Sequence, residues 1–308
     1  MRNVESYKPG KKAASSHTRG FSVPKKKDTV SSFNIKHDPK VIFRAIIYSL
    51  TSLVLICLII FSAYHLIRWK VESDLTNELI TALQSSSKIQ DVTSDESEST
   101  NPVSSVSADD PYWDLIKQNL ISADLNESKS VNIDTAGWIQ IPGTNINYPY
   151  VQTTDNDFYL NHSIDRLWND AGWVFLDYRN SKKLDDKNQI IYAHGRVDGS
   201  MFGSLQNVLT DDWQSATSNH VVKISTETEN SLWQVFSVYQ IPKTNDYITT
   251  KFGNDHSFEE YIKLIKTRSD YDFNTTVNVN DRIITLSTCI GFNDRVVLHA
   301  KLIKLASK

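Results

Sequence analysis

A cysteine and an arginine stand close together near the C-terminal end of the chain. Cys289 follows the β-branched run 282–288, and Arg295 opens the apolar run 295–303, and both compositions are typical of β-strands. The five residues between them contain Gly and an Asn-Asp pair, which favour a turn. We therefore expect a hairpin that brings the thiol and the guanidinium together. A thiolate beside a fixed cation can act as a nucleophile, while the guanidinium stabilises developing negative charge.

Both residues also have an ordinary structural interpretation. The chain holds two cysteines, and Cys57 lies inside a long apolar run, so no intramolecular disulfide is expected. A lone cysteine such as Cys289 is as often a small buried hydrophobe as a reactive thiol. An arginine that opens a strand is commonly just solvated. The closeness of the two favours the chemical interpretation, in which Arg295 donates to the oxyanion of a tetrahedral intermediate.

A cysteine nucleophile needs an acid–base partner. The C-terminal part of the chain offers five histidines: His162, His194, His220, His256 and His299. His194 leaves the apolar run 189–193 into a glycine-containing loop, which can present its ring at the rim of a barrel. Taken alone, this position at the end of a strand is more typical of a solvated histidine than of a catalytic one.

The other histidines are weaker candidates. His299 lies four residues beyond Arg295 on the same strand, so at about 3.3 Å per residue it lies about 13 Å away. His162 is a minor rival because it follows the segment 156–161. His220 and His256 lie among polar residues and are expected at the surface.

Short strands separated by turns would position these residues. Eight runs have strand composition: 137–141, 146–151, 173–176, 189–193, 221–225, 233–239, 282–288 and 295–303. Strands at this spacing predict a mainly β fold, an eight-stranded barrel that is closed or nearly closed.

Helices are expected around and within this barrel. Two of them interrupt the strands, at 201–209 and at 258–267, and the second precedes the last two strands and begins with a capping box from Ser257 to Glu260. Another helix is expected from Asp110 because apolar residues follow at helical spacing: Tyr112, Ile116 and Leu120.

The N-terminal third has a different character. The first 40 residues hold ten Lys or Arg against three acids, a balance of +7 that leaves −10 for the remainder. The run 45–66 contains no acid, Lys or Arg and spans about 30 Å as a helix, the hydrocarbon thickness of a bilayer. The basic side stays in the cytoplasm by the positive-inside rule, so the C-terminal body is expected outside the cell.

These features predict four consecutive parts. Residues 1–44 form a basic cytoplasmic tail, and 45–67 form a transmembrane helix. Residues 68–109 begin as a helical stalk with Val71, Leu75, Leu79 and Leu83 in register, and continue as a flexible linker rich in Ser, Thr and acids. Residues 110–308 form the extracellular catalytic domain.

Several function classes are disfavoured by the same sequence. The acidic body argues against nucleic-acid binding. The scattered histidines and single cysteine give no metal-ligand spacing, and no glycine-rich phosphate loop is present, so no cofactor or metal is expected. A papain-like protease is disfavoured because Cys289 follows the histidine in the chain and lacks that family's local signature.

Several stretches taken together resemble the sortases, the membrane-anchored cysteine transpeptidases of Gram-positive bacteria. The segment 285–289, read TLSTC, is followed closely by Arg295, and 191–205 looks like the family's histidine segment. Three further segments are similar: 137–149, NDFYLN at 156–161 and GWVFLDYRN at 172–180. The helix at 258–267 is similar to the one that marks class B.

The resemblance implies an activity and roles for individual residues. Cys289 would attack the Thr carbonyl of a C-terminal sorting motif, His194 would act as acid and base, and Arg295 would stabilise the oxyanion. The substrate groove would be lined by residues at matching positions: Asn156, Leu160, Tyr247, Ile248 and Ser287. Partners would be surface proteins with a sorting signal, an amine of a peptidoglycan precursor or pilin, and membrane lipid. Class B likeness favours an Asn-Pro-x-Thr motif.

The chain departs from the family pattern in two places. The loop from Cys289 to Arg295 is shorter than in many members, and Ile290 is apolar where some class B enzymes carry an acid. Two alternatives therefore stay open at this stage: a pilin-polymerising sortase, and a catalytically silent wall-binding module on the same barrel.

Overall fold

The computed structural model describes residues 38–93, 109–290 and 293–308, with Cys289 and Ile290 described by their backbone. The chain divides into two units, one that ends at Ile59 and one from Ile60 to Lys308. The second unit contains all of the β-structure.

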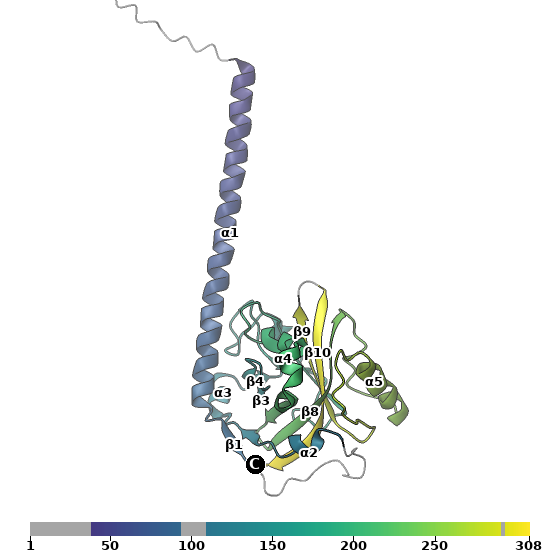
Figure 1. The fold of residues 1–308 in the computed structure, drawn as a ribbon. Coiled ribbons are helices and arrows are strands. Elements are labelled where there is room, and N and C mark those ends of the chain that lie inside the picture. Colours follow the sequence, from purple (N-terminus) through teal and green to yellow (C-terminus); the bar gives the residue numbers. More distant parts are fainter. Residues whose placement is uncertain (1–37, 94–108, 291–292) are drawn as a thin grey trace, which may run out of the picture. The chain divides into compact units, whose positions relative to one another are not determined.

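Helix α1 runs from Pro39 to Ser86 without a break (Figure 1). It is the one helix of the described residues that is long and apolar enough to cross a membrane. Its large apolar side chains are exposed from Val41 to Ile67, as a lipid-facing surface requires.

The C-terminal part of α1 packs through a face that shares Leu79 and Leu83, but not Val71 and Leu75, with the apolar spacing predicted from the sequence. Its buried residues are Ser73, Thr76, Ile80 and Leu83. By contrast, Val71 and Leu75 remain about half exposed, at 51% and 52%. The first buried residues of α1, Ser73 and Thr76, carry hydroxyl groups, and a search for apolar residues at helical spacing does not detect them.

A small two-stranded sheet follows α1. Strand β1 (Gln90–Val92) pairs antiparallel with β2 (Leu120–Ser122). The segment expected to be a flexible linker therefore contains a strand at its start, and residues 94–108 lie outside the described part of the chain. The helix expected from Asp110 is a single turn, α2 (Tyr112–Leu115), because Leu120 belongs to β2. Helix α3 (Asn126–Val131) leads into the barrel.

Eight strands close into a barrel, as the sequence predicts. They are β3 (Thr135–Gln140), β4 (Asn147–Val151), β5 (Phe175–Leu176), β6 (Asn188–Ala193), β7 (Val221–Ser225), β8 (Glu229–Pro242), β9 (Ile283–Ile290) and β10 (Asp294–Ser307). Their order around the barrel is β10-β8-β7-β3-β4-β5-β6-β9, and β9 pairs with β10 to close it. The β4–β5 and β6–β9 pairs are parallel and the others antiparallel.

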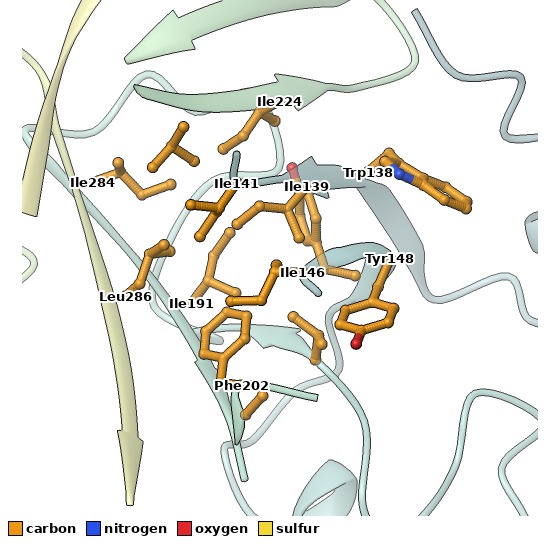
Figure 2. Close-up of a cluster of buried hydrophobic side chains, with 14 of the residues drawn as sticks. Trp138, Ile139, Ile141, Ile146, Tyr148, Ile191, Phe202, Ile224, Ile284 and Leu286 are labelled. Carbon is orange, nitrogen blue, oxygen red and sulfur yellow. The ribbon is translucent and has the colours of Figure 1, made fainter. Parts of the chain in front are cut away.

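Apolar side chains fill the barrel interior. Figure 2 shows Ile139 and Ile146 meeting Ile191 and Leu286 from the opposite wall, with Phe202 beside them. All five are fully buried. This core fixes the relative positions of β6 and β9, the two strands that lead to His194 and Cys289.

Short helices and one longer helix connect the strands. The segment expected as a helix at 201–209 is the 3₁₀ helix η3 (Gly203–Leu209). The other short helices are η2 (Phe158–Leu160), α4 (Asp211–Ser215) and η4 (Thr217–Asn219).

Helix α5 (Asp255–Thr267) precedes β9, as expected, and lies on the outside of the barrel (Figure 1). Its cap lies three residues earlier than the predicted capping box. Asn254 Oδ1 accepts from the Ser257 N–H at 2.8 Å, and Ser257 Oγ accepts from the Asn254 N–H. The apolar face of α5 packs against β8, β9 and β10 through Phe258, Tyr261, Ile262 and Ile265.

Candidate active site

Strand register brings the three predicted catalytic residues to one end of the barrel. Cys289 on β9 is the direct cross-strand partner of Arg295 on β10. On the other side of β9, Thr288 pairs with Ala193 of the parallel strand β6. Because paired parallel strands run in the same direction, the next residues on the two strands are Cys289 and His194.

His194 is held by a backbone carbonyl. Its Nε2 lies 2.6 Å from the oxygen of Leu160. Since a carbonyl can only accept, Nε2 carries the proton in this arrangement. The His194 carbonyl in turn accepts from the Phe202 N–H at 3.0 Å, which closes the loop that follows the histidine.

Gly172 allows this close packing around the histidine. It has φ +59°, a left-handed conformation that a side chain would strain. A Cβ there would lie 2.5 Å from the Tyr159 oxygen and 3.1 Å from Cδ2 of His194. The sequence reasoning gave Gly172 no role, although a glycine inside an otherwise bulky segment is a signal of close approach.

The turn between Cys289 and Arg295 is tied to the end of β8. The Lys243 N–H donates to Asn293 O at 2.7 Å, and Gln240 Nε2 donates to Asp294 Oδ2 at 2.7 Å. Arg295 is half-buried, and its Nη1 donates to Asp294 O at 2.9 Å. These bonds hold the short turn against the neighbouring strand.

A pocket of about 330 Å³ lies beside these residues. It includes His194 and Arg295 together with all five residues expected to line a substrate groove: Asn156, Leu160, Tyr247, Ile248 and Ser287. Its wall also contains residues that the sequence reasoning missed: Asp157, Phe175, Tyr192, Ala193, Lys243, Thr244, Asn245 and Thr288. Tyr192 lies two residues before His194, so strand alternation could have placed both on one face.

A buried carboxylate organises one wall of the pocket. The side chain of Asp177 is fully buried. It accepts from Tyr192 Oη at 2.9 Å, from Asn156 Nδ2 at 3.0 Å, and from Nε and Nη2 of Arg179 at 2.8 and 2.7 Å. Burial by itself raises the pKa of Asp177, but these hydrogen bonds outweigh it and hold the pKa below its usual value. Arg179 also donates to Ile248 O at 3.0 Å, so this network fixes three pocket residues.

Tyrosines fix the part of the pocket wall around Tyr247. Tyr247 Oη and Ser287 Oγ share a hydrogen bond of 2.9 Å. Tyr261 of α5 donates to the Tyr247 carbonyl at 2.5 Å. Arg268, at the end of α5, makes a two-pronged ion pair with Asp246, at 2.8 and 2.6 Å. The helix thus holds the loop that supplies Tyr247 and Ile248.

The rival histidines lie elsewhere. His299 is completely buried and bonded to Tyr239 Oη and Thr285 Oγ1, both at 2.9 Å. Burial, together with the charge of Arg268, lowers the pKa of His299 to about 3. His162 stacks on Phe158, and its Nδ1 contacts the Phe158 carbonyl.

Of the two histidines expected at the surface, one is buried. His220 is only 3% exposed and contacts the Gln214 carbonyl through Nε2 at 3.0 Å, so its surface assignment was wrong. The polar neighbours that suggested exposure form the short helix η4 (Thr217–Asn219) instead. His256 is exposed near the start of α5. Among the described residues, no group of three or more His, Cys, Asp or Glu side chains is arranged to hold a metal ion.

Comparisons with known proteins agree with this fold. The family model for the sortase domain matches residues 139–303. The sortase B of Listeria monocytogenes is 38% identical over 184 residues, which cover 58% of this chain and 74% of that protein.

Solved structures give the same result. The crystal structure of sortase B from B. anthracis in complex with AAEK1 has a TM-score of 0.60 and 30% identity, and covers 76% of this chain and 99% of that chain. The Staphylococcus aureus sortase B–substrate complex has a TM-score of 0.55 and 32% identity, over 59% and 85% of the two chains. A closed eight-stranded barrel, a domain match over more than half of the chain and these relatives all agree. The chain therefore belongs to the sortase family of cysteine transpeptidases and is class B-like.

Proposed function

We propose that Cys289 is the nucleophile of a class B-like sortase that cleaves a sorting motif after Thr and transfers the acyl group to an amine. The observation that supports this most is the register of β9. It pairs Cys289 with Arg295 on one side and sets it next to His194 on the other. The backbones of the three residues are then neighbours at one end of the barrel, and His194 and Arg295 line one pocket there.

The first half-reaction forms a thioacyl enzyme. The thiolate of Cys289 attacks the Thr carbonyl carbon, and the electron pair moves onto the carbonyl oxygen. Arg295 stabilises this oxyanion with its charge and its fork of N–H donors. When the oxyanion collapses, the C–N bond breaks and the imidazolium of His194 gives its proton to the leaving amine.

The second half-reaction runs in the opposite sense. An incoming amine attacks the thioester carbon, and the neutral His194 takes the proton that the amine loses. Collapse of the second intermediate expels the Cys289 thiolate and leaves a new amide bond. The same three side chains serve both steps, so no cofactor is needed.

The pocket suits a short peptide with a polar residue at one end. Leu160 and Ile248 offer apolar surface, while Asn156, Tyr192 and Ser287 offer hydrogen-bonding groups. An Asn-Pro-x-Thr motif, which class B likeness favours, has this mixture of amide and apolar groups. The related S. aureus sortase B was solved in a complex with substrate, which supports substrate binding by this fold.

The anchor places the proposed chemistry at the cell surface. In our proposal residues 45–67 cross the membrane, residues 1–44 remain in the cytoplasm and the barrel faces outward, with 110–308 carrying out catalysis. The length and apolar composition of α1 support the span, and the basic residues before it support the orientation. The partners are secreted proteins with a C-terminal sorting signal and an amine of the cell wall.

Identification of the transfer product tests this function. The full chain in detergent is incubated with an Asn-Pro-x-Thr or a Leu-Pro-x-Thr-Gly peptide plus either triglycine or a lysine side-chain amine, and the products are identified by mass spectrometry. We expect the Asn-Pro-x-Thr peptide to be joined through Thr to triglycine, and Cys289→Ala to form no product. Transfer to lysine alone would indicate a pilin-type enzyme, and no transfer to any amine would contradict the proposal.

A further inference from the structure

The part of α1 from Arg68 to Thr76, here called the 68–76 segment, contacts two stretches of chain beside His194. One is the loop that follows the histidine, and the other leads to Gly172. The 68–76 segment belongs to the same compact unit as the barrel, which begins at Ile60. Its contacts are polar and specific, although the reaction proposed for the barrel assigns this segment no task.

The first contact reaches the loop that follows His194. Ser73 is 7% exposed, and its hydroxyl donates to Asp198 Oδ2 at 2.6 Å. Arg196 Nη2 donates to the same Ser73 oxygen and also to Asp198 Oδ2, the latter at 2.8 Å. The Arg196 guanidinium lies over the ring of Trp69, 5.9 Å from its centre.

The loop between His194 and Phe202 is rigid enough to carry this constraint. The Phe202 N–H bonds to the His194 carbonyl, and Gly195 forms a bridge with Met201. Gly203 packs directly on Arg196, since a Cβ there would lie 2.1 Å from the Arg196 oxygen. Fixing the tip of such a loop therefore restricts the backbone of His194.

Asp198 is the charged centre of this contact. Ser200 donates to Asp198 Oδ1 through its hydroxyl at 2.6 Å and through its N–H at 3.0 Å. Burial by itself raises the pKa of Asp198, but the hydrogen bonds from Arg196, Ser200 and Ser73 outweigh it and hold the pKa far below its usual value. The carboxylate therefore stays ionised, and its bond with Ser73 is charge-assisted.

The second contact reaches the stretch that leads to Gly172, beside the histidine ring. Asn169 Nδ2 donates to Thr76 Oγ1 at 2.9 Å, and the Asp170 N–H donates to Glu72 Oε2 at 3.2 Å. Asn169 in turn accepts from the Gly172 N–H at 2.9 Å through its carbonyl. Gly172 is the residue that packs on the His194 ring.

We propose that the 68–76 segment positions His194, because it fixes the loop after the histidine through Ser73 and the segment beside its ring through Thr76 and Glu72. The part of α1 that follows the proposed membrane span then contributes to the catalytic site. Ser73 is a positioning residue, since it acts on His194 through Asp198 and Arg196. This inference rests on the acid–base role proposed for His194.

The test uses the full chain in detergent and three serine variants. Ser73→Ala removes the hydroxyl that joins Asp198 and Arg196, and Ser73→Thr keeps a hydroxyl. Ser85→Ala is the matched control, because Ser85 is exposed on the same helix and bonds only to its own turn, at Ala82 O. Peptide transfer is measured as kcat and KM, and the imidazole nitrogens of His194 are followed by NMR.

We expect Ser73→Ala to lower kcat by about 3- to 30-fold with little change in KM, because the pocket walls are intact. Its His194 nitrogen signals should shift away from the Nε2–H form. Ser73→Thr should recover most of the rate, and Ser85→Ala should match the wild type. A merely structural role would instead lower the unfolding temperature and leave kcat and the His194 signals unchanged in the folded protein, which would overturn the inference.

The two proposals can fail separately. A wild-type chain that transfers no peptide contradicts the proposed function, yet a His194 signal that shifts in Ser73→Ala still supports the positioning contact. A wild-type chain that transfers peptide, with identical kcat and His194 signals in Ser73→Ala, contradicts the positioning contact alone.

Discussion

Arg295 illustrates how one backbone register gives a side chain its chemical role. As the cross-strand partner of Cys289 it lies one strand away from the proposed nucleophile. Its Nη1 is engaged only with the neighbouring Asp294 carbonyl among the bonds of the described residues. The guanidinium can therefore turn its remaining donors toward an oxyanion without breaking a buried ion pair.

Loss of this guanidinium should slow catalysis far more than it weakens folding. We expect Arg295→Ala to lower kcat/KM for peptide transfer by about 10²–10³-fold, the usual effect of removing an oxyanion donor. Arg295→Lys should recover only a part, because a point charge lacks the fork geometry. Arg282→Lys, at the other end of β9, is the control and should be near wild type. If the kcat/KM of Arg295→Ala stays within a factor of two of the wild-type value, Arg295 does not stabilise the oxyanion.

At the residue scale, the sequence pointed to candidate site residues where a chemically reactive residue stands at the end of a strand-like run. Cys289 and Arg295 could be proposed from residue type and neighbouring apolar runs, whereas His194 was proposed because its segment resembles that of the sortases. Asp177 could not, because its role depends on contacts between segments that are remote in the chain. Gly172 carried a signal of close approach, but the histidine ring that it approaches is identified only by the structure.

Helix α5 lies outside the barrel, yet it shapes the pocket at one end of the barrel. Its Tyr261 hydroxyl holds the Tyr247 carbonyl, and its Arg268 holds Asp246. Asn188 of β6 donates to the same Tyr261 hydroxyl at 3.0 Å. The loop that presents Tyr247 and Ile248 is thereby anchored to both the helix and the barrel.

Removal of the Tyr261 hydroxyl should loosen this loop. We expect Tyr261→Phe to raise KM for the sorting peptide by about 3- to 10-fold, a loss in the range of a single buried hydrogen bond, with a smaller effect on kcat. Tyr271→Phe, which changes a partly buried tyrosine outside the pocket, serves as the control. If Tyr261→Phe lowers kcat and leaves KM unchanged, the helix does not act through the pocket wall.

At the element scale, the strands were the predictable part. Each of the eight β-branched or apolar runs became one barrel strand, because strands buried on both faces are apolar nearly throughout and composition alone reveals them. The face of α1 was predictable only in part. Of the four apolar residues in register, Leu79 and Leu83 pack on the core, but Val71 and Leu75 do not. Hydroxyl groups of Ser73 and Thr76 make the contact there, and hydrogen-bond partners of that kind leave no periodic pattern. The β1–β2 pair likewise joins segments about 30 residues apart.

Buried polar groups tie the whole domain together. Lys301 of β10 is 1% exposed and lies 3.9 Å from the buried Asp110, which also accepts from Gln234 and from the backbone and hydroxyl of Thr276. Two residues earlier on the same strand, His299 is buried as a neutral ring. Such groups make the stability of the domain depend on pH.

His299 sets the sign of that dependence at mildly acidic pH. Its folded pKa of about 3 lies below the usual 6.5, so between these values the unfolded chain binds a proton that the folded chain does not. Stability should therefore fall as pH decreases from 6.5, by about 1.4 kcal/mol per pH unit from this residue. Burial also lowers the pKa of His220, which adds to the same trend.

Urea unfolding of the segment 60–308 between pH 4.5 and 6.5 measures this slope. We expect His299→Gln to reduce the slope of stability against pH by about 1.4 kcal/mol per pH unit, which corresponds to one proton. His256→Gln, which changes an exposed histidine, should leave the slope unchanged. An unaltered slope in His299→Gln would mean that the ring is protonated in the folded state.

The central claim is that Cys289 carries the acyl group, and the mass of the intact protein tests it most directly. The full chain is mixed with an Asn-Pro-x-Thr peptide in the absence of added amine, quenched in acid, weighed and digested. We predict an added mass equal to the peptide cut after Thr, located on Cys289, released by hydroxylamine and absent from Cys289→Ala. Peptide cleavage that persists in Cys289→Ala, or an adduct on another residue, would contradict the account.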